Sequence, residues 1–314
     1  MTRYVAQRFA AGCGVLLVVS FLVFWLGTLI PGDLTTVLVG SEGATQQQYR
    51  ELRHRLGLDQ PIVVQYAHWL GGALRGNLGK SPITGLYATA EIARRAPITL
   101  ELALLALAES IVLGVFLGVF TAVRAHGLAD IAVRAILFVM FAIPPFVAGV
   151  LLVLAGALFL KPLYQVGYVP LAQSVGLNLR SMLLPSVSIA VPLAAMTAQM
   201  TRTSLLETLG QPYIVTAMAK GAPPRNVIYR HALKNALAPI ITLQGYVFGS
   251  LVGGLIVTEQ VFNLDGLASG LLAAIGRRDY SFVVTGTLVI AATYILANLL
   301  VDLLYPIVDP TQRA

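Results

Sequence analysis

Long stretches without charged residues alternate with polar ones along the chain. The first stretch, residues 9–30, carries no charge over twenty-two positions. It exceeds the apolar core of a signal peptide and is long enough to cross the hydrocarbon layer of a membrane as a helix. Five further apolar runs have comparable lengths, at residues 98–123, 132–160, 183–201, 237–258 and 282–306. The pattern predicts an all-α integral membrane protein with six transmembrane helices.

A long polar section follows the first run. Residues 31–97 contain an amphipathic pattern over Gln46–Leu58 and a shorter helical pattern over Tyr66–Leu74. We expect this section to lie outside the membrane as a long external segment. The predicted organisation has three parts: residues 1–97 with the first helix and the external segment, residues 98–306 with the other five transmembrane helices, and residues 307–314 as a short tail.

Composition agrees with a membrane protein. Hydrophobic residues make up 57% of the chain and charged residues 11%, whereas charged residues make up about 25% of a typical soluble domain. The formal net charge is +7. Because Lys and Arg gather at the cytoplasmic ends of membrane helices, this charge does not require a nucleic-acid partner. The single cysteine, Cys13, excludes a disulfide within the chain.

The distribution of Lys and Arg sets the expected orientation. Without the long 31–97 segment, an N-terminus in the cytoplasm places ten basic residues inside and four outside, as the positive-inside rule requires. The ten are Arg3, Arg8, Arg124, Arg134, Arg202, Lys220, Arg225, Arg230, Lys234 and Arg313, and the four are Lys161, Arg180, Arg277 and Arg278. Both termini are therefore expected in the cytoplasm.

Prolines interrupt two of the predicted spans. Pro144 and Pro145 lie in the third span, and Pro185 and Pro192 lie in the fourth. Because proline removes a backbone donor and clashes with the preceding turn, we expect kinks at these positions. Kinked helices are common around transport pathways, but they are also common in other membrane bundles.

Small residues and buried acids give candidates for a pathway or gate. Gly114 and Gly118 form a GxxxG pair, and Gly245, Gly249 and Gly253 repeat that spacing on one face of the fifth span. Such spacing lets helices approach closely, either within the chain or against a partner. Glu109 lies deep in a span, where a carboxylate must be paired or hydrated. The pathway or gate candidates are Glu109, Gly249, Gly253 and Glu259.

The polar stretch Tyr213–Pro239 predicts a short helix, a turn and a second short helix. Gly221 can adopt a positive φ at the end of the first helix. Pro223 and Pro224 stop one helix and suit the start of the next. The second helix would carry a partly cationic face. A solvated loop between two spans is the alternative.

These residues also resemble a known motif. The matching positions are Tyr213, Thr216-Ala217, Ala219-Lys220-Gly221, Arg230-His231-Ala232-Leu233, Asn235-Ala236 and Pro239. They resemble the cytoplasmic coupling loop of ABC-importer permeases, in particular the B-type dipeptide and oligopeptide permeases of the peptide/nickel branch. The family motif begins Glu-Ala-Ala, whereas this chain has Val215, Thr216 and Ala217 there.

Further pieces in the same order extend the resemblance to about residues 4–310. They include Pro31-Gly32-Asp33, Leu56-Gly57-Leu58-Asp59, Gly76–Ser81, Glu259–Phe262, Arg278-Asp279-Tyr280 and Asn298–Tyr305. The chain departs from the family pattern at Leu34 and Thr311. It also has Asp265 where proline often precedes Gly266, which leaves the shape of the last outer loop open.

The resemblance implies a type I ABC importer permease with a cytoplasmic coupling helix-turn-helix between helices four and five. Implied partners are a second homologous permease, one or more ABC ATPase subunits, an extracytoplasmic substrate-binding protein or lipoprotein, and membrane lipid. The implied location is the bacterial inner (cytoplasmic) membrane. ATP and Mg would be bound by the ATPase subunits, and no cofactor by this chain. The implied coupling residues are Tyr213, Thr216, Ala217, Lys220, Gly221, Arg225, Arg230 and His231.

Other functions do not explain the polar stretch Tyr213–Pro239. Gly79-Lys80-Ser81 ends like a phosphate-binding loop, but Leu74 occupies the position of its first glycine. The four histidines are scattered without a metal-binding or catalytic spacing, which argues against a membrane enzyme. A secondary transporter usually shows two related halves. The cargo stays open between dipeptides, longer peptides, nickel complexes and other small molecules.

Overall fold

The computed structural model describes residues 2–29, 46–55, 57–81, 83–159 and 167–308. Over these residues the chain is helical, and its only β-type pairing is an isolated bridge between Lys80 and Tyr87. Five helices are long and apolar enough to cross a membrane: α1 (Thr2–Leu29), α5 (Ala88–Val123), α8 (Val175–Leu209), α11 (Leu233–Gly254) and α14 (Tyr280–Val308).

The third predicted span bends at Pro144 and Pro145, where a kink is expected, but it bends more sharply than a kinked helix. Instead of one helix over 132–160, the structure has α6 (Leu128–Ala142) and α7 (Pro145–Phe159), bent by 99° at the break. Ile143 is extended, with φ −82° and ψ 118°, as a residue before proline prefers. The kink is therefore a complete break, and the count of six holds when the bent pair is taken as one span.

The fourth span passes through both of its prolines as a single helix. It is also longer than hydropathy indicated, beginning at Val175 and ending at Leu209. Ser174 caps its start by accepting a hydrogen bond from Leu177 N at 3.4 Å. Asn178 and Ser181 are buried inside the protein, so polar residues in this helix do not mark its end.

The second span begins ten residues earlier than predicted, at Ala88. The charged side chains Glu91, Arg94 and Arg95 interrupt the apolar pattern, yet they pair with one another and with Asp265. Pairing allows these residues to continue the helix instead of ending it.

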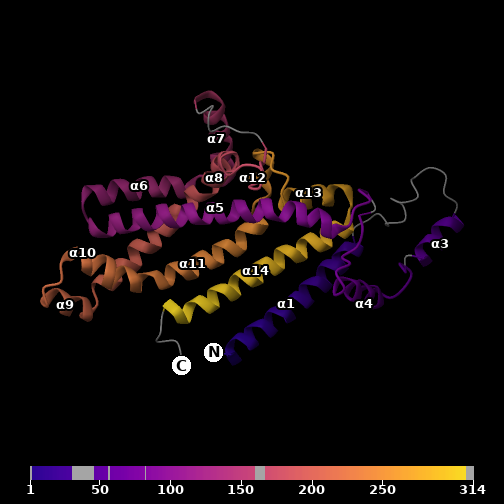
Figure 1. The fold of residues 1–314 in the computed structure, drawn as a ribbon, viewed down its shortest axis with the longest axis horizontal. Coiled ribbons are helices and arrows are strands. Elements are labelled where there is room, and N and C mark those ends of the chain that lie inside the picture. Colours follow the sequence, from indigo (N-terminus) through magenta and orange to yellow (C-terminus); the bar gives the residue numbers. More distant parts are fainter. Residues whose placement is uncertain (1, 30–45, 56, 82, 160–166, 309–314) are drawn as a thin grey trace.

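The segment after α1 contains the two helices that the sequence predicts. α3 spans Gln46–Arg55 and α4 spans Ile62–Ala73. The start of α4 differs from the prediction, because Pro61 precedes the first helical residue and can stand at such an N-terminus without losing a hydrogen bond. Figure 1 shows α4 beside the C-terminal part of α1.

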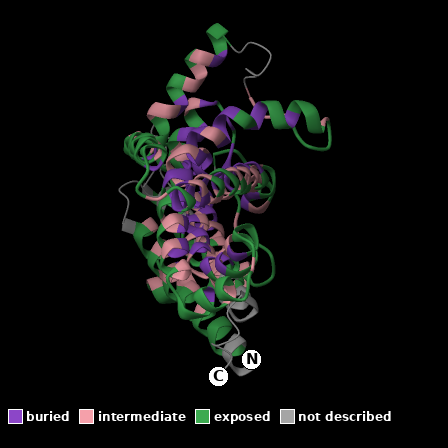
Figure 2. Ribbon diagram, turned by 90° about the vertical axis from the view of Figure 1, so that its left-hand side faces the viewer, coloured by how far each residue is buried: buried purple, intermediate pink, exposed green. Residues whose placement is uncertain are grey.

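Close helix packing joins α5 to α8. A Cβ added at Gly114 would lie 2.4 Å from Thr197 Cβ, and one added at Gly118 would lie 2.5 Å from Thr201 Cβ. The predicted GxxxG pair therefore mediates packing within this chain. Figure 2 shows the buried residues along the middle of the bundle and exposed residues over its surface.

Two groups of short helices lie at opposite ends of the bundle (Figure 1). At one end are α9 (Pro212–Ala219), α10 (Pro224–Asn226) and the π-helix η1 (Val227–Ala232), together with the start of α1 and the end of α14. Toward the other end are α12 (Ile256–Val261) and α13 (Leu267–Arg277).

Candidate functional site

The segment 212–235, here called the hairpin, has the turn that the sequence predicts. Gly221 adopts φ +84°, and its N–H donates to Met218 O at 2.9 Å. The second helix differs from the prediction, because it does not end near Leu237. It continues through η1 into α11, with helical geometry from Pro224 to Gly254. No helix-breaking turn follows Pro224, and Pro239 is accommodated inside α11.

One side of the hairpin is anchored in the bundle. Ile214, Val227 and Ala232 are buried and pack with Leu205 of α8 and Val119 of α5 in one apolar cluster. The hairpin is thus packed against the ends of two membrane helices.

A side-chain hydrogen bond joins the two arms of the hairpin. The side-chain amide of Asn235 donates to the hydroxyl of Tyr213 at 2.6 Å. This bond ties α9 to the first turn of α11.

The other side of the hairpin is exposed. Seven of the eight predicted coupling residues are exposed, namely Tyr213, Thr216, Lys220, Gly221, Arg225, Arg230 and His231, and Ala217 is half-buried. The sequence analysis missed three exposed apolar residues on the same segment: Val215, Met218 and Tyr229. The spacing of Val215 and Met218 on a helix that already buries Ile214 was the available signal. An apolar surface bordered by cations suits contact with another protein.

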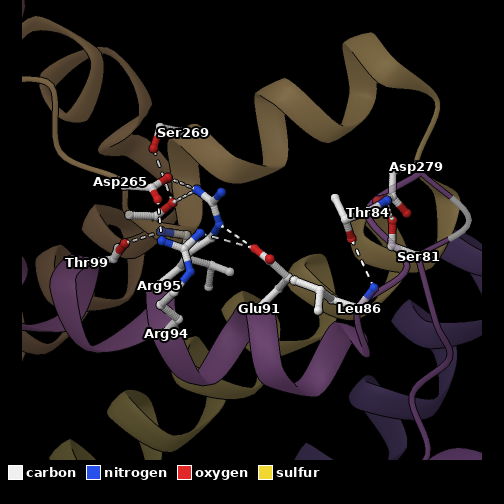
Figure 3. A network of polar contacts seen from close by, with 12 residues as sticks. Ser81, Thr84, Leu86, Glu91, Arg94, Arg95, Thr99, Asp265, Ser269 and Asp279 are labelled. Carbon is white, nitrogen blue, oxygen red and sulfur yellow. Dashed lines mark hydrogen bonds and ion pairs between the residues drawn. The ribbon is translucent and has the colours of Figure 1, made fainter.

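The opposite end holds a polar network that connects α5 with the α12–α13 region (Figure 3). Glu259 is fully buried and accepts hydrogen bonds from Thr99 Oγ1 at 2.5 Å and from Ser269 N at 2.7 Å. Thr99 Oγ1 in turn accepts from Leu267 N at 2.7 Å. The carboxylate and the hydroxyl therefore fix the start of α13 against α5.

Ion pairs surround this buried contact. Asp265 pairs with Arg94 at 2.5 Å and also with Arg95, and Arg95 Nε donates to Glu91 at 3.1 Å (Figure 3). Asp265 is the residue that replaces the expected proline. The departure from the family pattern thus has a structural counterpart, because the aspartate joins the α12–α13 loop to α5.

The acids inside the spans have hydroxyl partners. Ser186 donates to Glu109 Oε1 at 2.7 Å, while Oε2 is buried without a protein partner among the described residues. Tyr168 donates to Glu101 at 2.8 Å. Burial and this hydrogen bond raise the pKa of Tyr168 to about 12. Of the two alternatives for a carboxylate in a span, pairing or hydration, the structure shows pairing for one oxygen of Glu109. A role of Glu109 in a pathway stays a prediction.

The two glycine candidates contact another helix of the same chain. A Cβ at Gly249 would lie 2.4 Å from the ring of Tyr294, and one at Gly253 would lie 3.6 Å from Ile290. Both partners belong to α14. These contacts explain the glycine spacing by packing, and a pathway role for these positions stays a prediction.

A cavity of about 480 Å³ opens between α6, α8 and α11. Its polar residues are Arg134, Gln199 and Thr203, which the sequence analysis did not select for a pathway. Gln199 and Thr203 lie four residues apart on one exposed face of α8, and that spacing was the available signal. Its other lining residues include Phe138, Phe141, Met196 and Met200.

A buried ion pair stands near this cavity. Asp130, which is 1% exposed, accepts from Arg202 Nη2 at 2.8 Å and lies 3.5 Å from Arg134 Nε. It also accepts from His126 N at 3.1 Å. The aspartate thus joins the start of α6 to α8. Among the described residues, no three His, Cys, Asp or Glu side chains are grouped so that they could hold a metal ion.

Two family models match the chain. Residues 114–314 match "Binding-protein-dependent transport system inner membrane component", and residues 1–103 match "Binding-prot-dependent transport system membrane comp, N-term". The matches together include the hairpin, α12 and α13.

Similar curated proteins match the chain over nearly their whole length. The chain is 37% identical over 313 residues to the "Probable peptide ABC transporter permease protein y4tP" of Sinorhizobium fredii, covering 100% of both chains. It is 32% identical over 339 residues to the "Di/tripeptide transport system permease protein DppB" of Pseudomonas aeruginosa, covering 100% of this chain and 99% of the relative.

A solved structure shares the fold. It is described as "Crystal structure of an amino acid ABC transporter with histidines" and superposes with a TM-score of 0.52 at 15% sequence identity. The match covers 69% of this chain and 94% of the other. At this identity the likeness shows the fold alone.

Proposed function

Because the chain belongs to the family of binding-protein-dependent transport system inner membrane components, we propose that it is the membrane-spanning permease subunit of an ATP-driven ABC importer of di- or oligopeptides. The observation that carries the proposal is full-length similarity to relatives named as peptide and di/tripeptide permeases. The chain itself catalyses no reaction, and partner subunits hydrolyse ATP.

The hairpin is the proposed contact with an ABC ATPase. Met218 and Tyr229 are 51% and 55% exposed and offer apolar contact area, with Arg225 and Arg230 exposed beside them. The opposite side is packed against α5 and α8. Movement of the ATPase would therefore reach two membrane helices directly through the hairpin, biasing the bundle between two conformations.

The expected orientation follows from the same assignment. The hairpin, the start of α1 and the end of α14 share one end of the bundle (Figure 1), which is the cytoplasmic end in the proposed function. The end with α12 and α13 then faces a substrate-binding protein or lipoprotein outside the inner membrane. This arrangement agrees with the excess of basic residues expected inside.

The cavity between α6, α8 and α11 is the proposed wall of the pathway. Gln199 and Thr203 are exposed within a membrane-spanning helix, and Arg134 is 45% exposed beside them. Polar side chains in a span usually face water or protein instead of lipid. A second homologous permease would face this cavity and complete the pathway, where the Met and Phe side chains can contact apolar side chains of a peptide.

The transport experiment uses the chain with its partner permease, ATPases and binding protein in proteoliposomes. We expect ATP-dependent accumulation of labelled dipeptides or oligopeptides. Uptake of nickel without any peptide would overturn the assigned cargo. Peptide uptake driven by an ion gradient in the absence of ATP would overturn the transporter class.

A photo-crosslinking experiment tests the docking surface separately. A benzophenone attached at Met218→Cys, in a Cys13→Ser background, is expected to crosslink to the ATPase. The matched control is Val257→Cys, which is 47% exposed on α12 and lies away from the hairpin (Figure 1). Crosslinking to the ATPase from position 257, and none from position 218, would contradict the proposed orientation.

A further inference from the structure

We propose that α4 lies against membrane lipid, at the boundary between acyl chains and headgroups, in the leaflet nearest the C-terminal end of α1. The helix belongs to the segment for which the sequence predicts an external position. Three features of the described residues argue for lipid contact. They are the depth along α1 at which α4 is attached, the hydrogen bonds of Gln65 and Tyr66 within the protein, and the apolar exposed face of α4.

The first feature is the depth at which α4 is attached. The hydroxyl of Tyr66 lies 2.6 Å from Ser20 Oγ and donates to Leu17 O at 3.3 Å. Both partners lie inside the apolar stretch Ala6–Thr28 of α1. Ser20 is eight residues from Thr28, which corresponds to about 12 Å at about 1.5 Å per helical residue. The side chain of Tyr66 therefore reaches the hydrocarbon part of the span.

Ring contacts hold the helix in the same place. The ring of Tyr66 lies 5.2 Å from that of Phe21, and the ring of Trp69 lies 5.7 Å from that of Phe24, between centroids. Tyr and Trp are the residues enriched where hydrocarbon meets headgroups. Their attachment to α1 places α4 at that level.

The second feature is that two polar side chains of α4, Gln65 and Tyr66, form hydrogen bonds within the protein. Gln65 Nε2 donates to Gln60 O at 2.8 Å, and the Tyr66 hydroxyl is bonded to α1. No residue of Ile62–Ala73 is an acid, a lysine or an arginine. Such a helix can leave bulk water without burying a charge.

The third feature is the exposed face. Val63 and Val64 are 63% and 39% exposed, and Ala67 follows Val63 by one turn. Leu22 and Leu26 of α1 are likewise exposed, and only 6% of the apolar span of α1 is buried in the protein. His68 is exposed on the neighbouring edge, where the headgroup layer offers polar contacts.

The neighbouring helix α3 provides the contrast. Its sequence QQQYRELRHR is polar at nearly every position, and its described side chains are exposed. The same segment thus contains one helix suited to water and one suited to lipid. This contrast gives an internal reference for an experiment.

The test uses nitroxide labels in the complete transporter in lipid nanodiscs, with Cys13→Ser and cysteine-free partner subunits. Labels are placed at Val63→Cys in α4, Gln47→Cys in α3 and Val18→Cys in α1. Collision rates are measured with molecular oxygen, which partitions into lipid, and with a nickel chelate, which stays in water. We expect oxygen to exceed the chelate several-fold at position 63, at a depth between those of 47 and 18.

Two outcomes would overturn the proposal. A chelate accessibility at position 63 equal to that at 47 places α4 in water. Protection at position 63 from both reagents shows that protein covers this face. Peptide uptake by the labelled Val63→Cys transporter is measured in parallel, so a failure of the proposed transport function is distinguished from a failure of the lipid contact.

Discussion

Thr99 and Glu259, separated by 160 positions in the sequence, meet in a buried hydrogen bond of 2.5 Å that also fixes the N-terminus of α13. The threonine hydroxyl acts as donor to the carboxylate and as acceptor from Leu267 N. Two separate parts of the chain therefore depend on one hydroxyl group.

Replacing this hydroxyl is expected to destabilise the protein. Thr99→Val leaves a buried carboxylate oxygen and a backbone N–H without their partner, at a cost of about 1–3 kcal/mol. The measurement is the thermal unfolding midpoint of the detergent-solubilised protein. Thr121→Val is the matched control, since Thr121 is also buried in α5 but bonds only to carbonyls of its own helix. Equal effects of the two substitutions would contradict a special role for Thr99.

Close packing of α5 on α8 predicts a steep size limit at Gly114. The added methyl group of Gly114→Ala would lie 2.9 Å from Ala194 O as well as close to Thr197. We expect overpacking to cost about 1–3 kcal/mol, measured by the same thermal unfolding. Gly14→Ala in α1 serves as control because nothing lies within 4 Å of the new Cβ. A stable Gly114→Ala protein would show that the two helices separate easily.

The turn of the hairpin predicts a difference between two substitutions at one position. Gly221 has φ +84° and open space around its Cβ position, so backbone conformation alone limits what it can become. Gly221→Val is expected to cost about 1–2 kcal/mol and to abolish peptide uptake while membrane insertion is retained. Gly221→Asn is expected to keep most activity, because asparagine tolerates the left-handed region. Native uptake by Gly221→Val would show that the hairpin does not transmit force.

Two aspartates that both pair with arginines are expected to differ in their contribution to stability, because one is buried and the other is exposed. Asp130→Asn breaks an ion pair in which Asp130 is 1% and Arg202 13% exposed, and we expect a loss of about 3–5 kcal/mol. Asp265→Asn acts on a carboxylate that is 53% exposed, and we expect a loss of no more than about 1 kcal/mol. The measurement is the unfolding midpoint at low and high salt. Only the Asp265 effect is expected to shrink with salt, since exposed charges are screened more strongly.

The exposed pair of His54 and Asp59 predicts a pH dependence. The hydrogen bond of 2.6 Å to Asp59 raises the pKa of His54 above 6.5, and His54 lowers the pKa of Asp59 below 3.8. For the raised histidine, the stabilisation is complete below about pH 6.5 and is lost as the pH rises through the folded-state pKa. For Asp59, whose pKa is lowered, the stabilisation is present above the ordinary aspartate pKa of 3.8 and is lost as the pH falls through the folded-state pKa. The contact between His54 and Asp59 is therefore strongest between the ordinary pKa of aspartate, 3.8, and that of histidine, 6.5.

Chemical modification of His54 measures this shift. Diethyl pyrocarbonate reacts with neutral imidazole, and mass spectrometry of the 46–59 region reports its extent at each pH. We expect the midpoint to fall when Asp59 is replaced by Asn. Modification at pH 9, where the ring is neutral in both proteins, is the control for accessibility. An unchanged midpoint would mean that the pair does not persist in solution.

Local chemistry made the hairpin predictable from the sequence. Gly221 followed by Pro223 and Pro224 favours a turn, and the structure has one there. The same local pattern predicted a second short helix that ends before the fifth span. It could not show that the helix continues through η1 into α11. The role of the exposed coupling residues stays a prediction.

Contacts distant in sequence account for most differences from the prediction. Arg94 and Arg95 were assigned to the polar external segment 31–97 because their partner, Asp265, is about 170 positions away. Hydropathy likewise indicates which residues avoid water, but it does not indicate where the helix axis bends. It therefore identified the third span without revealing the 99° bend between α6 and α7. The polar residues of the cavity were missed for a similar reason, since their neighbours come from three helices.

The π-helix between the hairpin and α11 has a geometric consequence. A π turn holds about one residue more than an α turn, and each residue of an α-helix corresponds to about 100° of rotation. If the Val227–Ala232 segment tightened into ordinary α-helix, the hairpin would have to rotate about the axis of α11 as well as shift along it. The exposed side chains of Tyr229 and Arg230 would then point in a new direction. A change between π and α geometry in this segment would therefore reorient the exposed side of the hairpin relative to α11.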